Sequence, residues 1–422
     1  MKTQFKLITL ATLLATAVGA AWASPSFKAG TYTATAPGIH GNVTVEVTFT
    51  ANKIADIKVT KQAETVGIGS KAVEILPGRM LAAQSPAVDG ITGATITTQA
   101  IRTAVSDCIK QAGVDPTVLV PLVVKKTGGQ KTLETDMVVV GGGGSGMSAT
   151  IRGRMNGMNV ILVEKMPYIG GAAAISGGQV VAQGSKLQKA FGSTEDSPES
   201  MIKDFMANGH NLNDPGKISL YANNVGATID WLHEQVGVKF IPNDLPYLAE
   251  YSHRRALEFE GGAKTMAQHL REVIAGNGAQ VLYSTRVEKL LQDKDGRVIG
   301  VEATDDNGVK YTIKSKATLL TTGGFGNNKD MLVEPIKSTL YYGPVSSTGD
   351  GHRMAMELGA KTQLMQYGKR YPNGIEVAPG KAKSTIYANV GAFDQAGILV
   401  NIDGKRFVNE KASNRHILDP ML

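Results

Sequence analysis

A run of glycines between two apolar segments is the part of the sequence whose residue types and spacing best suit chemistry. The run reads Gly-Gly-Gly-Gly-Ser-Gly and fits the pattern GxGxxG at Gly141, Gly143 and Gly146. In this pattern the first glycine permits a tight turn, the second lets a pyrophosphate approach the backbone, and the third lets a helix pack against the preceding strand. The N-terminus of that helix offers free N–H groups to the phosphates. The motif therefore predicts a dinucleotide-binding loop.

An acidic residue lies at the spacing that completes this motif. The apolar segment 159–164 is predicted to be a strand, and it ends at Glu164. A carboxylate about 20 residues beyond the glycines commonly accepts hydrogen bonds from ribose hydroxyls. Strand, glycine loop, helix, strand and acid follow one another over 135–164. We interpret this segment as the βαβ unit of a parallel α/β sheet rather than as a glycine-rich turn without a ligand.

Further glycine-rich segments favour FAD over NAD as the dinucleotide. One follows Glu164 and could approach the flavin end of a bound FAD, and another follows the apolar strand predicted over 317–321. A nicotinamide enzyme has no particular need for these extra loops. Beside the three motif glycines and Glu164, the residues expected to contact FAD are Gly144, Ser145, Lys165, Gly170, Gly171, Ser176, Gly177, Gly178, Gly323 and Gly324.

The elements around these residues fall into two groups. Alternation with period two over 30–60 predicts an antiparallel sheet, and helices follow it, so residues 28–113 are expected to form a small α+β domain. Residues 114–133 are predicted to be a linker because they contain prolines, paired lysines and paired glycines. The other expected elements are helices over 71–83, 97–111 and 261–276, strands over 136–140 and within 280–306, and mainly helical structure over 198–237.

Composition limits the kinds of partner and site. A chain of 422 residues is expected to form two or three domains. The formal net charge is +7, but the basic residues are scattered and often lie beside acids, which favours a solvated surface over nucleic-acid binding. Cys108 is the only cysteine, so an internal disulfide, a cysteine zinc site and Cys-x-x-Cys-His haem attachment are excluded. We expect no metal site.

The N-terminus is typical of a secretory signal peptide over residues 1–23. Lys2 and Lys6 precede an apolar run, and Ala21-Trp22-Ala23 supplies small residues on both sides of a cleavage site. An uncleaved membrane anchor is the alternative, but the run is shorter than the ~20 residues that a membrane span needs. The sequence therefore predicts a periplasmic protein that is soluble after cleavage.

The segment 89–95, Asp-Gly-Ile-Thr-Gly-Ala-Thr, precedes a predicted helix and on its own would be an ordinary turn and helix cap. It resembles the attachment motif of the FMN-binding domain family, Asp-x-x-Ser/Thr-Gly-Ala-Thr, and the upstream segment 64–69 is similar to that family as well. In the family, FMN is esterified through its phosphate to the last threonine of the motif. The resemblance therefore implies covalent FMN at Thr95.

From Thr135 onward the sequence resembles the fumarate reductase/succinate dehydrogenase flavoprotein family, in particular its periplasmic branch. Besides the glycine motif, the similar segments are 261–262, 321–325, 348–351, 397–401 and 404–410, and the resemblance implies that Asp350 contacts FAD. The resemblance implies a Rossmann-type FAD-binding domain over 134–370 and the start of a capping domain over 371–422. An FMN domain ahead of such a domain is similar to urocanate and acrylate reductases, whereas flavocytochrome relatives carry haems there.

The resemblance also implies a reaction and the residues that carry it. In the family, hydride passes from the flavin to the β-carbon of an enoate, and an arginine shortly after the Arg-Phe-x-Asn-Glu motif donates a proton. That position corresponds to Arg415, one residue farther from Glu410 than in the fumarate-reducing pattern, and Arg406 is the other candidate. Because an arginine pKa lies above ~12, the donor needs a relay, for which Asp394 and Glu410 are candidates. Either arginine could instead clamp the substrate carboxylate.

Two departures from the family bear on function. Tyr371-Pro372-Asn373 stands where fumarate-reducing members have His-Pro-Thr, which favours a monocarboxylic enoate such as urocanate or an aryl-acrylate over fumarate. The sequence ends at Leu422, where the family's capping domain continues, so we expect an incomplete capping domain. The alternatives are a flavin electron-transfer module without catalysis and a dehydrogenase that runs the reaction in reverse. The expected redox partner is a periplasmic cytochrome or a quinol-oxidising membrane protein.

Overall fold

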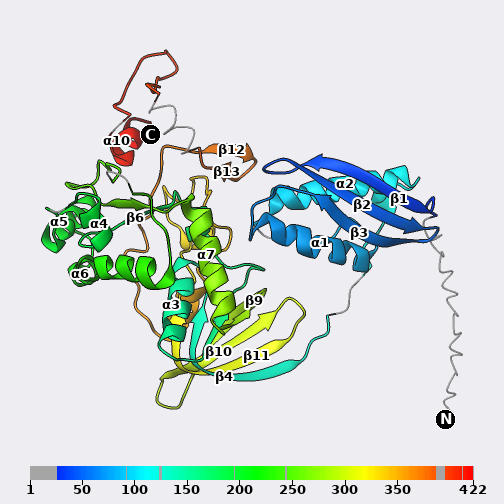
Figure 1. Cartoon of the computed structure of the whole chain (residues 1–422), viewed down its shortest axis with the longest axis horizontal. Helices are drawn as coiled ribbons and strands as arrows, with labels where there is room; N and C mark the ends of the chain where they lie inside the picture. Colours follow the sequence, from blue (N-terminus) through cyan, green and yellow to red (C-terminus); the bar gives the residue numbers. More distant parts are fainter. Residues whose placement is uncertain are drawn as a thin grey trace, which may run out of the picture.

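Two β-sheets organise the chain, and each belongs to a separate unit (Figure 1). The computed structural model describes residues 26–91, 93–122, 126–193, 195–242, 245–385, 395–410 and 412–421. The predicted signal peptide and Asp394 lie outside these ranges. Within them, no helix combines the length and the apolar character that crossing a membrane requires.

The first unit is a three-stranded antiparallel sheet with two helices packed against it, in the strand order β1-β2-β3. Val43, Val45, Val47 and Phe49 of β2 are buried and alternate with more exposed residues, because successive side chains of a strand point to opposite faces. The elements are β1 (Gly30–Pro37), β2 (Asn42–Thr50), β3 (Lys53–Lys61), α1 (Gly69–Ala83) and α2 (Thr95–Gln111), followed by the 3-10 turn η1 (Pro116–Val118). Both helices begin two residues before their predicted starts.

The second unit is built on a six-stranded sheet in the order β8-β5-β4-β11-β10-β9. Its strands are β4 (Gln130–Val140), β5 (Val160–Val163), β8 (Gln280–Leu282), β9 (Thr285–Gln292), β10 (Val298–Asp305) and β11 (Lys310–Leu320). β8, β5, β4 and β11 are parallel, whereas β10 and β9 continue the sheet as antiparallel strands. β4 begins at Gln130, inside the range assigned to the linker, because it pairs with β11 from Lys310 onward.

Helices cover the parallel part of this sheet. α3 (Gly144–Met155) and α7 (Gly262–Gly276) pack against one face, where Met147 and Leu270 join Val139 in one buried cluster. α8 (Asp350–Glu357) lies at the other face, where Met354 packs with Val138. All four residues of β5 are buried, as expected for a strand covered on both faces. The α/β fold preceded by a small α+β unit is confirmed.

A helical segment and a C-terminal segment complete the second unit. The helical segment contains η2 (Gly171–Ile175), β6 (Gln179–Val181), α4 (Lys186–Ala190), α5 (Pro198–Asn208), α6 (Pro215–Trp231), η3 (Leu232–Val236) and β7 (Ala256–Glu258). The C-terminal segment contains η4 (Lys329–Met331), the hairpin of β12 (Ile375–Ala378) and β13 (Lys381–Lys383), α10 (Asn414–Leu418) and η5 (Asp419–Met421). The predicted helical structure over 198–237 is present.

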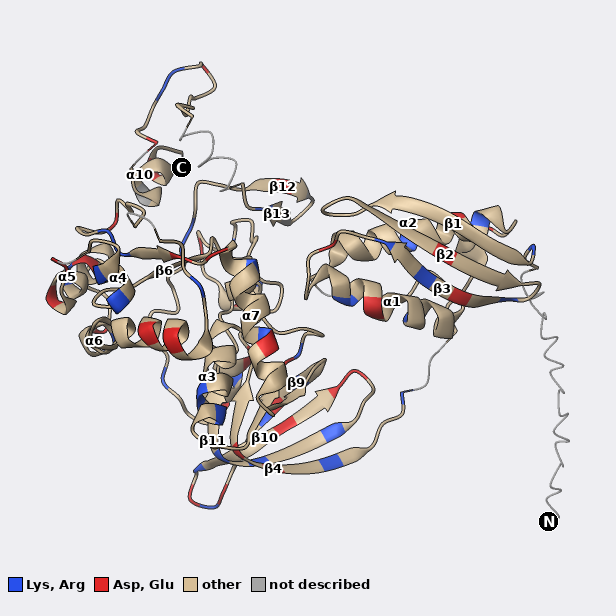
Figure 2. Ribbon diagram, viewed as in Figure 1, with Lys and Arg blue, Asp and Glu red and all other residues tan. Residues whose placement is uncertain are grey.

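Charged residues of both signs share the same elements (Figure 2). On β3, Lys58 pairs with Asp56 at 2.8 Å, and on α1, Lys71 pairs with Glu74 at 2.6 Å. Such exposed pairs contribute little to stability, but they partly neutralise each base locally.

Candidate cofactor sites

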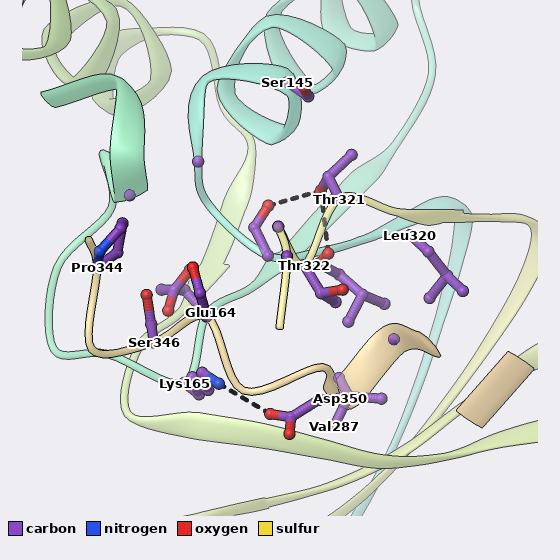
Figure 3. A pocket seen from close by; sticks show the side chains of 18 of the residues that line it. Ser145, Glu164, Lys165, Val287, Leu320, Thr321, Thr322, Pro344, Ser346 and Asp350 are labelled. Atoms are coloured by element: carbon purple, nitrogen blue, oxygen red, sulfur yellow. Dashed lines mark hydrogen bonds and ion pairs between the residues drawn. The ribbon is translucent and has the colours of Figure 1, made fainter. Parts of the chain in front are cut away.

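A cavity of about 700 Å³ opens where β4, β5 and β11 end at the same edge of the sheet (Figure 3). Parallel strands place their carboxyl ends together, which is where ligands bind in open α/β sheets. Ten of the predicted FAD-contacting residues line this cavity: Gly141, Gly143, Gly144, Ser145, Glu164, Lys165, Gly171, Gly323, Gly324 and Asp350. The other five, Gly146, Gly170, Ser176, Gly177 and Gly178, are not among its lining residues.

The three motif glycines serve different purposes in the turn from β4 into α3. Gly141 has a φ of +103°, and a Cβ there would lie 2.6 Å from the Thr321 carbonyl oxygen. A Cβ on Gly146 would overlap the Gly141 carbonyl oxygen, so this glycine allows the helix to pack closely. A Cβ on Gly143 would meet no atom within 4 Å, and Gly143 lines the cavity. The space beside Gly143 suits a diphosphate at the start of α3.

Glu164 is joined to the glycine loop. Its carboxylate accepts hydrogen bonds from the Gly142 amide at 2.6 Å and from the Met166 amide at 2.7 Å. Burial raises the pKa of Glu164, although these amide bonds and the charge of Lys165 oppose that effect. The carboxylate is only partly satisfied by two amides and lines the cavity, where it can accept ribose hydroxyls.

Asp350 binds several cations, one of which is Lys165, the residue that follows Glu164 (Figure 3). Its carboxylate contacts Lys165 at 2.9 Å, Arg286 at 2.7 Å and Arg353 at 2.8 Å. Burial favours a higher pKa, but hydrogen bonds and charge from Lys165 and the arginines hold the Asp350 pKa below its ordinary value. Among the residues that line this cavity, Lys165 and Arg286 balance the carboxylates of Glu164 and Asp350.

Sequence reasoning missed several residues of this wall. Thr321 donates from its hydroxyl to the Gly141 carbonyl at 2.7 Å and so ties the end of β11 to the glycine loop. Arg286 and His352 line the cavity, and the His352 Nδ1 atom is buried without a hydrogen-bond partner. Nothing near Arg286 in the sequence signals a site. His352 stands two residues after Asp350, but only the turn into α8 places it on the wall. The volume, the glycine loop and the Glu164 acceptor together fit FAD.

In the first unit, a buried acid positions the helix that begins at Thr95, the predicted attachment residue. Glu64 is 4% exposed and accepts hydrogen bonds from the Ile39 amide at 2.9 Å and from the Thr97 hydroxyl. Thr97 lies in the first turn of α2, which begins at the exposed Thr95. The segment 64–69 therefore holds the start of α2 against the sheet and leaves Thr95 accessible to a phosphate ester. Thr92 of the motif lies outside the described residues.

A second cavity of about 610 Å³ adjoins the first. Gly324 and Pro344 line the first cavity, and their chain neighbours Phe325 and Gly343 line the second. The wall of the second cavity is aromatic and basic, and no acidic residue is among those that line it. Its aromatic and basic lining residues are Phe325, Tyr341, Tyr342, Tyr367, Tyr371, Lys329, Lys369 and Arg370.

Contacts within this wall restrict some of these side chains. The Tyr342 hydroxyl donates to the Asn373 amide oxygen at 3.1 Å, and burial raises the pKa of Tyr342. The Lys369 ammonium lies 4.8 Å from the centre of the Tyr371 ring, within the range of a cation–π interaction. The wall therefore offers neutral aromatic rings and positive charge, which suits a planar anion.

The structure brings the predicted catalytic residues together less completely than the predicted FAD-contacting residues. Arg415 lies in α10, whose last residue, Leu418, lines the second cavity. Glu410 accepts a hydrogen bond from the Leu399 amide at 2.7 Å and pairs with Arg406 at 2.6 Å. The Arg406 guanidinium lowers the pKa of Glu410 to about 2. Among the described residues, this pair is not part of either cavity wall.

Comparisons with known proteins show that the chain contains an FAD binding domain and an FMN-binding domain. The family model described as FAD binding domain matches residues 136–422, and that described as FMN-binding domain matches residues 38–110. The chain is 31% identical over 388 residues to a urocanate reductase of Eggerthella lenta, an alignment that covers 90% of this chain and 63% of the relative. It is 34% identical over 282 residues to a fumarate reductase (cytochrome) of Shewanella frigidimarina, covering 65% of this chain and 48% of the relative.

A solved structure is similar as well. It is the open conformation of a flavocytochrome c3 fumarate reductase, which superposes with a TM-score of 0.59 at 30% identity and covers 68% of this chain and 50% of that chain. The chain thus spans less than two thirds of the length of each of these relatives.

Proposed function

Because the chain belongs to the FAD binding domain family and carries an FMN-binding domain, we propose that it is a periplasmic two-flavin reductase of α,β-unsaturated carboxylates. Thr95 would hold FMN as a phosphate ester and the cavity beside Gly143 would hold FAD, a pair of flavins that would supply electron transfer from FMN to FAD. A bound FAD supplies hydride to the β-carbon of the substrate. Positive charge, an apolar run and small residues follow one another in residues 1–23, and this order supports export.

The observation that carries the substrate proposal is the second cavity beside the FAD cavity. Its tyrosines can stack on a planar unsaturated acid, and Lys369 and Arg370 can bind the carboxylate. A second carboxylate would find no histidine in the segment 371–373. An aryl-acrylate or urocanate fits this wall better than fumarate does. The urocanate reductase of Eggerthella lenta, named for such a substrate, supports this choice.

The chain's own residues then place and protonate the substrate. The backbone around Gly324 and Phe325 separates the two cavities and determines how the substrate meets the FAD. Arg415, in the helix that ends at the second cavity, is proposed to donate the proton as negative charge develops on the substrate. Since Glu410 is bound to Arg406, reprotonation through Glu410 would require that pair to open. Clamping of the carboxylate is the alternative role of Arg415.

Anaerobic oxidation of reduced methyl viologen by the flavin-loaded protein tests the proposal. Urocanate, an aryl-acrylate, acrylate and fumarate should be offered in turn, and the two aromatic acids should give the highest kcat/KM. An Arg370→Met change should raise KM for them, whereas Lys264→Met on the exposed side of α7 should not. Protein that carries both flavins but reduces none of the acids would instead be an electron-transfer module. Oxidation of the saturated acids alone, with an oxidised dye supplied as the electron acceptor, would identify a dehydrogenase.

A further inference from the structure

The two cofactor-binding units meet along a seam, defined here as the contacts of Val66, Gly67 and Gly93 with Tyr168 and Arg271. In Figure 1 the three-stranded unit lies beside the six-stranded unit, on the side of α7, which carries Arg271. The first three residues belong to the two segments that resemble the FMN-attachment family. Tyr168 belongs to the loop that follows Glu164. The seam therefore joins the segments that resemble the FMN-attachment family to the loop that follows Glu164.

Gly93 and Tyr168 form one end of the seam. Gly93 has a φ of +83°, and a Cβ there would overlap the Tyr168 hydroxyl oxygen. Glycine is thus required by its backbone conformation and by the close approach of the ring. Burial raises the pKa of Tyr168 to about 12, and the charge of Glu164 acts in the same direction. The Tyr168 hydroxyl therefore stays neutral and can lie against the loop that contains Gly93 without introducing a buried charge.

Arg271 forms the other end and bonds to both units. Its Nη1 atom donates to the Ile169 carbonyl at 3.0 Å, and its Nη2 atom donates to the Val66 carbonyl at 3.5 Å. A Cβ on Gly67 would lie 2.6 Å from the guanidinium carbon, and Gly67 has a φ of +79°, so a side chain there would be strained and would displace the guanidinium from this position. The Gln268 side chain, one turn earlier on α7, also accepts from this guanidinium, at 3.0 Å from Nη2 and 3.3 Å from Nε, and so helps to orient it toward the two carbonyls.

A small cavity between the two ends shares a wall with the FAD cavity. Its volume is about 130 Å³, and Ile68 and Gly93 line it from one unit while Met166 and Tyr168 line it from the other. Glu164 and Gly171 line both this cavity and the FAD cavity. Thr95 follows Gly93 by two residues. The loop that contains Gly93 and leads to Thr95 thus lies on one side of Glu164 and Gly171, and the FAD cavity lies on the other side.

We propose that Tyr168 and Arg271 are positioning residues of a docking interface that holds the Thr95 attachment point against the wall of the FAD cavity. This inference rests on the proposed two-flavin function, because it assigns the seam the task of keeping the two cofactor sites close together. Arg79 and Asp306 form a further contact between the units at 3.3 Å, with both side chains substantially exposed. That pair reports on docking but contributes little to it.

Cross-linking measures docking without any substrate. Cysteines introduced by R79C and D306C in the flavin-loaded chain can be joined by a short bis-maleimide, while the native Cys108 is fully buried and raises no competing reaction. Tyr168→Ala combined with Arg271→Ala should slow the intramolecular cross-link by about tenfold, since a hydrogen bond from a charged donor is typically worth about that factor or more. Tyr168→Phe, which keeps the ring against Gly93, should retain most of the rate.

The control is Tyr247→Ala combined with Lys264→Ala, two exposed residues of the same unit that are not among the residues of the seam. Cross-linking as slow in this control as in the seam variant, or no cross-link in the parent, overturns the proposal. A second readout is the bleaching of FAD by dithionite, a small donor that reaches the FAD directly. This rate should not change in the seam variant, and a loss would assign Tyr168 and Arg271 to FAD binding instead. A protein that cross-links as expected but reduces no enoate retains the seam and loses only the proposed activity.

Discussion

The Glu164 carboxylate accepts a hydrogen bond from the Gly142 amide at 2.6 Å, which joins the acid at the end of β5 to the glycine loop after β4. The two parts of the nucleotide motif are therefore one connected structure before any ligand binds. The Met166 amide, at 2.7 Å, holds the other carboxylate oxygen. Glu164 is in this way fixed at the cavity wall, with acceptor capacity left for a ligand.

Glu164→Gln should weaken FAD binding by roughly tenfold to a hundredfold. The amide has one acceptor oxygen in place of two, so it cannot satisfy both backbone amides and the ribose hydroxyls, and each lost bond costs about 0.5–1.5 kcal/mol. Titration of the apoprotein with FAD, followed by quenching of flavin fluorescence, gives the Kd. Glu302→Gln, on the exposed side of β10, is the matched control and should bind as the parent does. Equal affinity of the two variants would remove Glu164 from the site.

Gly143→Ala and Gly146→Ala should fail in different ways. The methyl group on Gly143 enters open space on the cavity wall, so the free energy of unfolding of the apoprotein should change by less than about 1 kcal/mol while FAD affinity falls. The methyl group on Gly146 overlaps the Gly141 carbonyl oxygen and should destabilise the apoprotein by about 1–3 kcal/mol or more. Urea unfolding of the two apoproteins, together with FAD titration, separates the effects. Similar losses of stability in both would contradict the roles assigned to the two glycines.

Thr95→Ala should remove the covalent FMN without unfolding the first unit. Thr95 is exposed at the start of α2 and contributes nothing to the buried cluster of that unit. Intact mass measured after denaturation should show one FMN on the parent and none on the variant. Thr103→Ala on the same helix should keep the flavin, and Thr95→Ser should keep it as well, because the hydroxyl remains. An unchanged mass in Thr95→Ala would place the attachment elsewhere.

The pair of Arg406 and Glu410 should set an acid limit for the C-terminal segment. The folded pKa of Glu410, about 2, is below its ordinary value of 4.5, so the pair stabilises the fold above pH 4.5. That contribution is lost as the pH falls from 4.5 through about 2. In Arg406→Gln the Glu410 pKa should return toward 4.5, as carboxyl NMR titration can measure. A midpoint that stays near 2 would show that the Leu399 amide, the second cause of the shift, is sufficient alone.

Local motifs could be recognised from the sequence because their parts are short and regularly spaced. The glycine run, Glu164 and the attachment segment before Thr95 each lie within about 30 residues of their partners, and strand and helix periodicity places them at element ends. The α/β fold, the small α+β unit and FAD were predicted in this way, whereas FMN followed only from the resemblance of the segment 89–95 to the attachment motif of a known family. The roles of Gly170, Ser176, Gly177 and Gly178 as cofactor contacts do not follow from the cavity, which these residues do not line.

Contacts between distant segments could not be predicted. The binding of Asp350 by Lys165 and Arg286, the place of His352 on the cavity wall and the seam between Gly93 and Tyr168 all join residues far apart in the chain or on loops. The sequence alone indicated both cofactors: FAD because a phosphate-binding turn requires glycines at fixed spacing, and FMN because the segment 89–95 resembles the attachment motif of a known family. Only the tertiary structure decided how the two cofactor sites lie against each other and which charges face the FAD, because long-range packing has no periodic signature in the sequence.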